Sequence, residues 1–202
     1  MLRLTILTIA TLALLSTGAF ESQASGKKKK KADVHDHLHI EDIEASDNPR
    51  EFIQGKTDVD GYLTIGWWYK NKDLKEAFSI INEGIKHNPK AFQLHYQLGQ
   101  LYLERAKSET KNIQVPNEES LETLKLAQQS YKTAAELGIK QRSKAKVADW
   151  GNVKELDVRG AARMTVLMER RYGDHLEADR LSHEYADKLG GDEKLDRHKH
   201  AH

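Results

Sequence analysis

Residues 62–102 read YLTIGWWYKNKDLKEAFSIINEGIKHNPKAFQLHYQLGQLY, and a spacing that begins here occurs twice in the chain. Each copy places an aliphatic residue next to a glycine, then an aromatic residue, and later an alanine followed by a large apolar residue. Apolar residues at steps of three and four indicate amphipathic helices. The first copy consists of Ile65, Gly66, Tyr69, Asp73, Ala77, Ile81, Gly84 and Pro89, and the second of Leu98, Gly99, Tyr102, Ala127, Tyr131 and Ala134.

The two copies resemble the tetratricopeptide repeat, which carries a Leu-Gly pair and an aromatic residue on one helix and an alanine-rich pattern on the next. Ala77 and Leu98 lie 21 residues apart, the interval expected between the middle of one hairpin of about 34 residues and the start of the next. The resemblance implies an all-α fold, a TPR-like α-solenoid of about three stacked antiparallel helical hairpins. Because such hairpins present a surface, it also implies a binding function.

The helical domain is expected to span residues 48–189. Asn48-Pro49 is typical of a helix start, and Phe52-Ile53 is expected to cover the first end of the hairpins. The third hairpin is degenerate, as the last unit of such an array often is, and self-association through an open end is possible. The expected helices are Asp58–Asn71, Asp73–Asn88, Ala91–Ala106, Leu121–Leu137, Val153–Tyr172 and His175–Leu189, and the apolar face of the third hairpin includes Leu167.

Two polar segments interrupt the repeat pattern. The polar stretch at residues 107–119 replaces the tight turn of the repeat and lengthens the second copy by about 16 residues. Asn117 within it is the expected cap of the following helix. Gly138 is the expected C-cap of that helix. A basic linker then follows at residues 139–152.

Composition supports a helical binding protein and excludes several classes. Hydrophobic residues make up 38% of the 202 residues and charged residues 31%, which suits an elongated helical array better than one large core. The net charge of +1 gives no reason to expect nucleic acid as a partner. The chain has no cysteine, which excludes disulfides and thiol catalysis. No enzyme motif occurs, neither a glycine-rich phosphate loop nor His-Glu-x-x-His nor Gly-x-Ser-x-Gly.

The first 24 residues have the pattern of a signal peptide. A short positive start precedes apolar residues 4–15, and small residues place a cleavage site near Ala24 or Ala19. The run Lys27–Lys31 follows closely, and positive charge at this place resists export, so an uncleaved anchor is the competing interpretation. We expect a periplasmic or secreted protein, with membrane contact only through Lys27–Lys31 or an uncleaved N-terminal segment.

Two tails flank the helical domain, residues 25–47 and 190–202, and both are expected to be disordered because they are polar and lack periodicity. Each carries a His-x-His-x-His pattern. Alternate residues of an extended chain point the same way, so three imidazoles can converge on Zn, Cu or Ni. The alternative is a solvated tail whose histidines have no role. The candidate metal ligands are His35, His37, His39, His198, His200 and His202.

The resemblance places a ligand groove on the inner helix of each hairpin. Trp67 and Trp68 are adjacent, so on a helix their rings point about 100° apart, and one can enter the core while the other faces a ligand. Exposed Trp, Tyr and long polar side chains suit the binding of a peptide or partner helix. Packing between repeats is the alternative role, and it applies to Trp68 and Tyr69 more than to Trp67. The candidate groove residues are Trp67, Lys70, Asn71, Tyr96, Gln100 and Glu104.

Two functions are therefore expected from the sequence. The first is an exported, non-enzymatic adaptor or scaffold that holds a protein or peptide partner in a concave helical groove. The second is an envelope protein that sequesters or delivers a metal ion through its histidine tails. An assembly factor anchored by its N-terminal segment is a further alternative.

Overall fold

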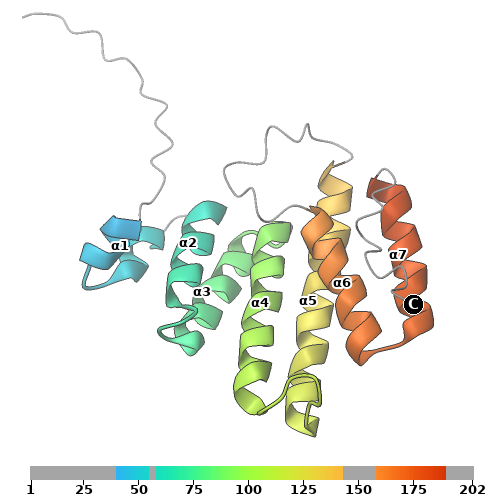
Figure 1. The fold of residues 1–202 in the computed structure, drawn as a ribbon. Helices are drawn as coiled ribbons and strands as arrows, with labels where there is room; N and C mark the ends of the chain where they lie inside the picture. Colours follow the sequence, from blue (N-terminus) through green and yellow to red (C-terminus); the bar gives the residue numbers. More distant parts are fainter. Residues whose placement is uncertain (1–39, 55–57, 143–157, 190–202) are drawn as a thin grey trace, which may run out of the picture. The chain divides into compact units, whose positions relative to one another are not determined.

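The computed structural model describes residues 40–54, 58–142 and 158–189 (Figure 1). These residues form α-helices and one 3₁₀ helix and contain no strand, so the predicted all-α fold is confirmed for this part of the chain. All of them belong to one unit, which spans residues 36–202. In order, the elements are α1 (Ile40–Ala45), η1 (Pro49–Ile53), α2 (Val59–Tyr69), α3 (Leu74–His87), α4 (Phe92–Glu109), α5 (Glu118–Arg142), α6 (Val158–Tyr172) and α7 (His175–Leu189).

Short polar side chains cap the N-termini of helices α2, α3 and α5. The Asp58 carboxylate accepts hydrogen bonds from the backbone N–H groups of Asp60 and Gly61. Asp73 accepts one from Glu76 at 3.0 Å, and Asn117 one from Ser120 at 2.8 Å. Each bond satisfies a donor that has no partner within the first helical turn. The predicted caps at Asp73 and Asn117 are confirmed.

The expected end of the fourth helix at Gly138 is wrong. Helix α5 continues through Gly138 to Arg142, so the first four residues of the expected linker are helical. Gly138 is buried, and a Cβ atom there would lie 2.6 Å from Cγ2 of Val158 on α6. This glycine therefore permits the close approach of two helices. The rest of the expected linker, residues 143–152, and the first five residues of the expected helix Val153–Tyr172 lie outside the described ranges.

Two further boundaries differ from those expected. Helix α4 extends to Glu109 and α5 begins at Glu118, so the loop between them is residues 110–117 rather than 107–119. The expected disordered tail at 25–47 includes the short helix α1, whose Ile43 is fully buried in a cluster with Ile53 and Tyr62. Its two isoleucines, Ile40 and Ile43, form too short a pattern among charged residues to indicate a helix, which is why α1 was missed.

Neighbouring helices pack against each other in chain order. The contacts of α2 with α3 run antiparallel, because the backbone at Gly66 approaches Ile81 and the backbone at Gly84 approaches Tyr62. Helices α4 and α5 are likewise antiparallel: Gly99, near the middle of α4, approaches the ring of Tyr131, and the Gln141 side chain donates a hydrogen bond to the carbonyl of Lys90, just before α4.

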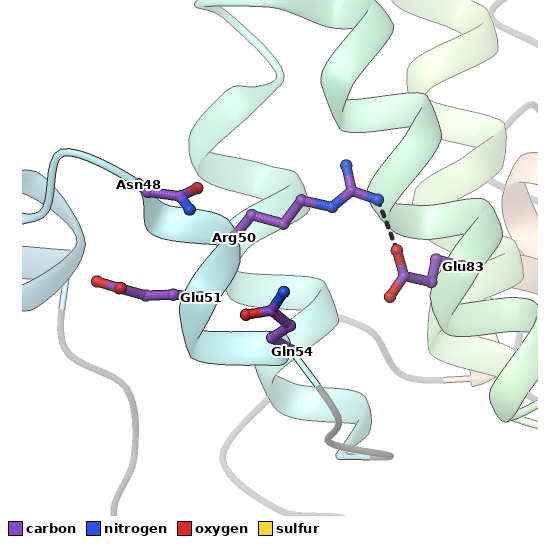
Figure 2. Close-up of a pocket in the computed structure, with 5 residues that line it drawn as sticks. All are labelled: Asn48, Arg50, Glu51, Gln54 and Glu83. Carbon is purple, nitrogen blue, oxygen red and sulfur yellow. Dashed lines mark hydrogen bonds and ion pairs between the residues drawn. The ribbon is translucent and has the colours of Figure 1, made fainter.

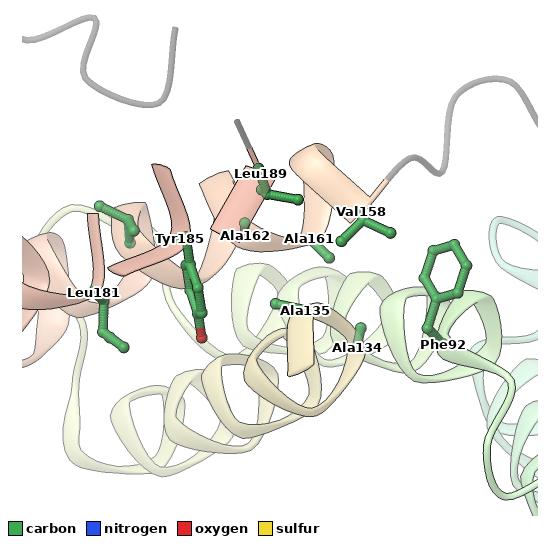
Figure 3. Packing of buried hydrophobic residues seen from close by; sticks show 10 residues of the cluster. Phe92, Ala134, Ala135, Val158, Ala161, Ala162, Leu181, Tyr185 and Leu189 are labelled. Carbon is green, nitrogen blue, oxygen red and sulfur yellow. The ribbon is translucent and has the colours of Figure 1, made fainter. Parts of the chain in front are cut away.

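Three buried clusters hold the helices together. The first joins α1, η1, α2, α3 and α4, and includes Ala77 with Leu98 packed against it. The second joins α4, α5 and α6 around Tyr131 and includes Ala127. In the third, Phe92 of α4 lies near small residues of α5 and α6, with Leu181, Tyr185 and Leu189 of α7 completing it (Figure 3). The interior is thus built from successive helix contacts.

No helix in the described ranges is long and apolar enough to cross a membrane.

Arg50 ties the N-terminal segment to α3. Its guanidinium donates to Glu83 at 2.5 Å, pairs with Glu76 and lies 3.3 Å from the Ser79 hydroxyl. Figure 2 shows Arg50 reaching from η1 toward Glu83, while Asn48, Glu51 and Gln54 line the small pocket beside it. The Tyr62 hydroxyl donates to the other oxygen of Glu83 at 3.3 Å. One arginine therefore connects η1 with two turns of α3.

Replacing Gly99 with alanine should lower the free energy of unfolding, although alanine is the better helix former. Alanine gains up to about 1 kcal/mol in helix propensity. Its Cβ, however, would lie 2.8 Å from Cε1 of Tyr131, and such overpacking typically costs about 1–3 kcal/mol. Urea denaturation measures the difference. If Gly99→Ala costs as much in a Tyr131→Leu background, where the ring is absent, the close contact is not the cause.

Replacing Arg50 with glutamine should loosen residues 40–54 more than the rest of the fold. The variant loses pairs that join two elements, and roughly 1 kcal/mol of stability is expected to go with them. Arg180→Gln is the matched control, since Arg180 also pairs with two carboxylates, Glu177 and Glu184, but all three lie on α7. Hydrogen exchange of the amides of residues 40–54 should accelerate in Arg50→Gln alone; equal protection in both variants would contradict this role.

Candidate functional site

Trp67 of α2 and Lys70, the residue that follows the helix, form a pair at the surface. The Trp67 side chain is 53% exposed, and the Lys70 ammonium nitrogen lies 3.8 Å from the centroid of its ring. Asn71, just past the end of the helix, is also exposed. A cation over the face of an indole is attracted by the ring quadrupole. The pair offers an apolar surface and a positive charge at one place.

Trp68 has a different environment from its neighbour. It is half-buried against the first cluster, and its ring meets that of Tyr69 edge to face with centroids 4.7 Å apart. Its indole N–H has no hydrogen-bond partner in the described part of the chain. Trp68 therefore has a packing role, whereas the exposed ring of Trp67 has no comparable structural explanation.

The candidate residues of α4 divide into two kinds. Gln100 and Glu104 are half-exposed, and Glu104 pairs with Lys107 at 3.0 Å. Tyr96 packs against two of the buried clusters, and its ring lies 5.4 Å from that of Tyr131 in an edge contact. Tyr96 therefore contributes to the core as well as to the surface.

A buried hydrogen bond fixes α2 beside α4. The side-chain amide of Gln97, which is buried, donates to the backbone carbonyl of Leu63 at 3.1 Å. Each helix is antiparallel to α3, so they run in the same direction. Trp67 lies one turn beyond Leu63, and Gln100 lies one turn beyond Gln97. The bond therefore holds the two parallel helices together within one turn of Trp67 and Gln100.

Tyr131 lies beneath the α4 residues. Its hydroxyl is buried and has no hydrogen-bond partner among the described residues. Burial, with smaller contributions from Tyr96 and Glu104, raises the pKa of Tyr131 far above its usual value, so the phenol stays neutral and cannot supply charge to a ligand.

Helix α6 adds a surface that the sequence analysis missed. Arg163, Leu167 and Arg171 follow at four-residue steps and are exposed, Leu167 by 36%. Their neighbours on α6 are used for packing: Met168 is buried against α5, and Arg170 donates to Asp179 of α7 at 2.7 Å. The assignment of Leu167 to the apolar face was therefore wrong. The four-residue spacing was visible in the sequence, but not which face neighbouring helices cover.

Helix α6 shares a buried cluster with α4. Met164, one turn before Leu167, packs against the cluster around Tyr131, as Tyr96 of α4 does. We call Trp67, Lys70, Gln100, Glu104, Arg163, Leu167 and Arg171 together the α2/α4/α6 face; Lys70, Gln100 and Glu104 are half-exposed, and the others are exposed.

Other candidate sites have weaker support. In the pocket of Figure 2, the charges of Arg50 and Glu83 are paired with each other. This ion pair joins η1 to α3 and therefore has a structural role. The six histidines proposed as metal ligands lie outside the described residues. Within the described ranges, no group of three or more His, Asp or Glu residues is placed to hold a metal ion.

No protein-family model, curated protein or solved structure matches this chain.

Proposed function

We propose that this protein is an exported, TPR-like adaptor that binds a segment of a partner protein on its α2/α4/α6 face. The observation that carries the proposal is the exposed Trp67 with Lys70 stacked on its ring. A tryptophan loses little conformational entropy when a partner covers it, which is why this residue often dominates binding energy. The adjacent Trp68 is used in packing, so exposure of Trp67 is specific to its side of α2.

The arrangement of α2 and α4 also supports the TPR-like part of the proposal. The Gln97 side chain bonds to the carbonyl of Leu63, and the matching residues Gly66 and Gly99 of these two helices lie 33 apart, close to the 34-residue period of the tetratricopeptide repeat. Equivalent helices related by this period lie parallel and side by side, and their exposed residues form a continuous strip. Export is supported by the apolar residues 4–15 and the small residues that follow them.

Photo-crosslinking in cells tests the partner-binding face. A crosslinking amino acid placed at Gln100 should give a discrete adduct with a partner protein. The same amino acid at Gln129, an exposed position on α5, should give no such adduct. Adding Trp67→Ala to the Gln100 derivative should abolish the adduct without changing the helical circular dichroism signal. Equal adducts from Gln100 and Gln129, or an adduct unaffected by Trp67→Ala, would overturn the assignment.

A second candidate function rests on the paired histidine tails, because two His-x-His-x-His patterns occur near opposite ends of the chain. Neutral imidazoles at alternate positions favour Zn, Cu or Ni. We expect each metal to bind the full chain more tightly than a variant with the six histidines replaced by asparagine, when titrated by calorimetry. Equal affinity in both proteins would exclude metal sequestration by the tails, and it would leave the proposal for the α2/α4/α6 face unaffected.

A further inference from the structure

The arginines of the described chain differ in how their charges are used. Most have partners within the fold: Arg50, Arg105, Arg170 and Arg180 form ion pairs with carboxylates, and Arg159 donates to the carbonyl of Leu189. Arg163 and Arg171 are the exceptions among the arginines whose side chains the structure describes, a set that does not include Arg142. Neither forms an ion pair or hydrogen bond with any described residue, and both are exposed on the same strip of α6.

The two arginines have a fixed relation to an exposed apolar residue. They are eight residues apart on one helix, which separates their Cα atoms by about 12 Å. Leu167 lies midway between them and is 36% exposed. Arginine is suited to bidentate recognition of carboxylates. The strip thus presents two carboxylate-binding groups on either side of an apolar contact.

We propose that this strip selects partner segments in which two acidic residues flank an apolar side chain. The proposal rests on the adaptor function and names the chemistry of its partner. The carboxylates pair with Arg163 and Arg171 while the apolar side chain covers Leu167. On a partner helix the spacing corresponds to acidic residues about eight apart, and on an extended strand to residues about four apart.

A protein segment fits this strip better than a nucleic acid does. Nucleic-acid sites follow the phosphate backbone with many basic residues, whereas α6 offers two arginines separated by leucine. Trp67 on the same face adds apolar contact of the kind that dominates protein interfaces.

Selection from a random-sequence peptide library displayed on phage tests the proposal, with the purified full chain as the target. Enriched peptides should carry paired Asp or Glu residues around a Leu, Ile, Met or Phe. Fluorescence anisotropy then measures the affinity of a selected peptide. Two exposed ion pairs together contribute up to about a tenfold change in affinity, so Arg163→Gln/Arg171→Gln should weaken binding roughly tenfold. Raised salt should weaken the wild-type complex but have much less effect on the double variant.

The matched control is Arg105→Gln/Arg180→Gln, which removes the same charge from arginines that are paired within their own helices. This variant should bind the peptide within about twofold of wild type, since only long-range charge is lost. Equal losses in the two double variants would overturn the proposal, as would enrichment of neutral peptides. If a DNA oligonucleotide competes as effectively as the acidic peptide, the strip is a polyanion site instead.

The same selection separates failure of this inference from failure of the adaptor function. Enriched peptides that are neutral but lose affinity in Trp67→Ala would leave the adaptor in place and remove only the role of the arginines. If no enriched peptide depends on Trp67 for binding, both the adaptor function and the role of the arginines are rejected.

Discussion

The fold depends on how closely the backbones of adjacent helices approach each other. At Gly84 and Gly99 the space that a side chain would occupy is filled by the rings of Tyr62 and Tyr131, and at Gly138 by Val158. A glycine in a helix costs up to about 1 kcal/mol relative to alanine, so three such sites are favourable only because of the packing that they permit. Large side chains on one helix can then bury against the backbone of the next, which is how a chain with few aromatic residues closes its interior.

This close packing determines which residues remain on the surface. One side of α2 is covered, because the Ile81 side chain packs against the backbone at Gly66 and the Gln97 side chain donates a hydrogen bond to the carbonyl of Leu63. Trp67 lies outside this contact and stays exposed, and Gln100 of α4 stays half-exposed. The surface proposed for binding is therefore a consequence of helix packing, in which parallel helices from successive pairs expose equivalent strips. A hydrophobic residue on such a strip is exposed although its neighbours in sequence are buried.

The sequence predicted those features that depend on local patterns. The periodicity of Ala77 and Ile81, with the cap at Asp73, was sufficient to predict α3. Prediction failed where one residue type has two structural uses. Gly138 suits a helix end as well as a close helix contact, and only the position of Val158, in an element separated by residues 143–157, distinguishes them. The prediction for α6 failed for a related reason. Leu167 and Met168 are both apolar, and only tertiary packing determines which of them is exposed.

The arrangement of charge extends this argument to recognition. The chain has nearly equal numbers of acidic and basic residues, so net charge indicates no partner. Exposed ion pairs contribute little stability, and leaving Arg163 and Arg171 unpaired therefore costs the free protein little. An incoming carboxylate at the same place gains more if water is excluded, because charges interact more strongly at lower effective dielectric. Leu167 between the two arginines supplies the apolar contact that excludes water. An acidic segment without an apolar residue would leave both ion pairs hydrated and screened by salt, and an apolar segment without acidic residues would leave both guanidinium groups partly desolvated and unpaired.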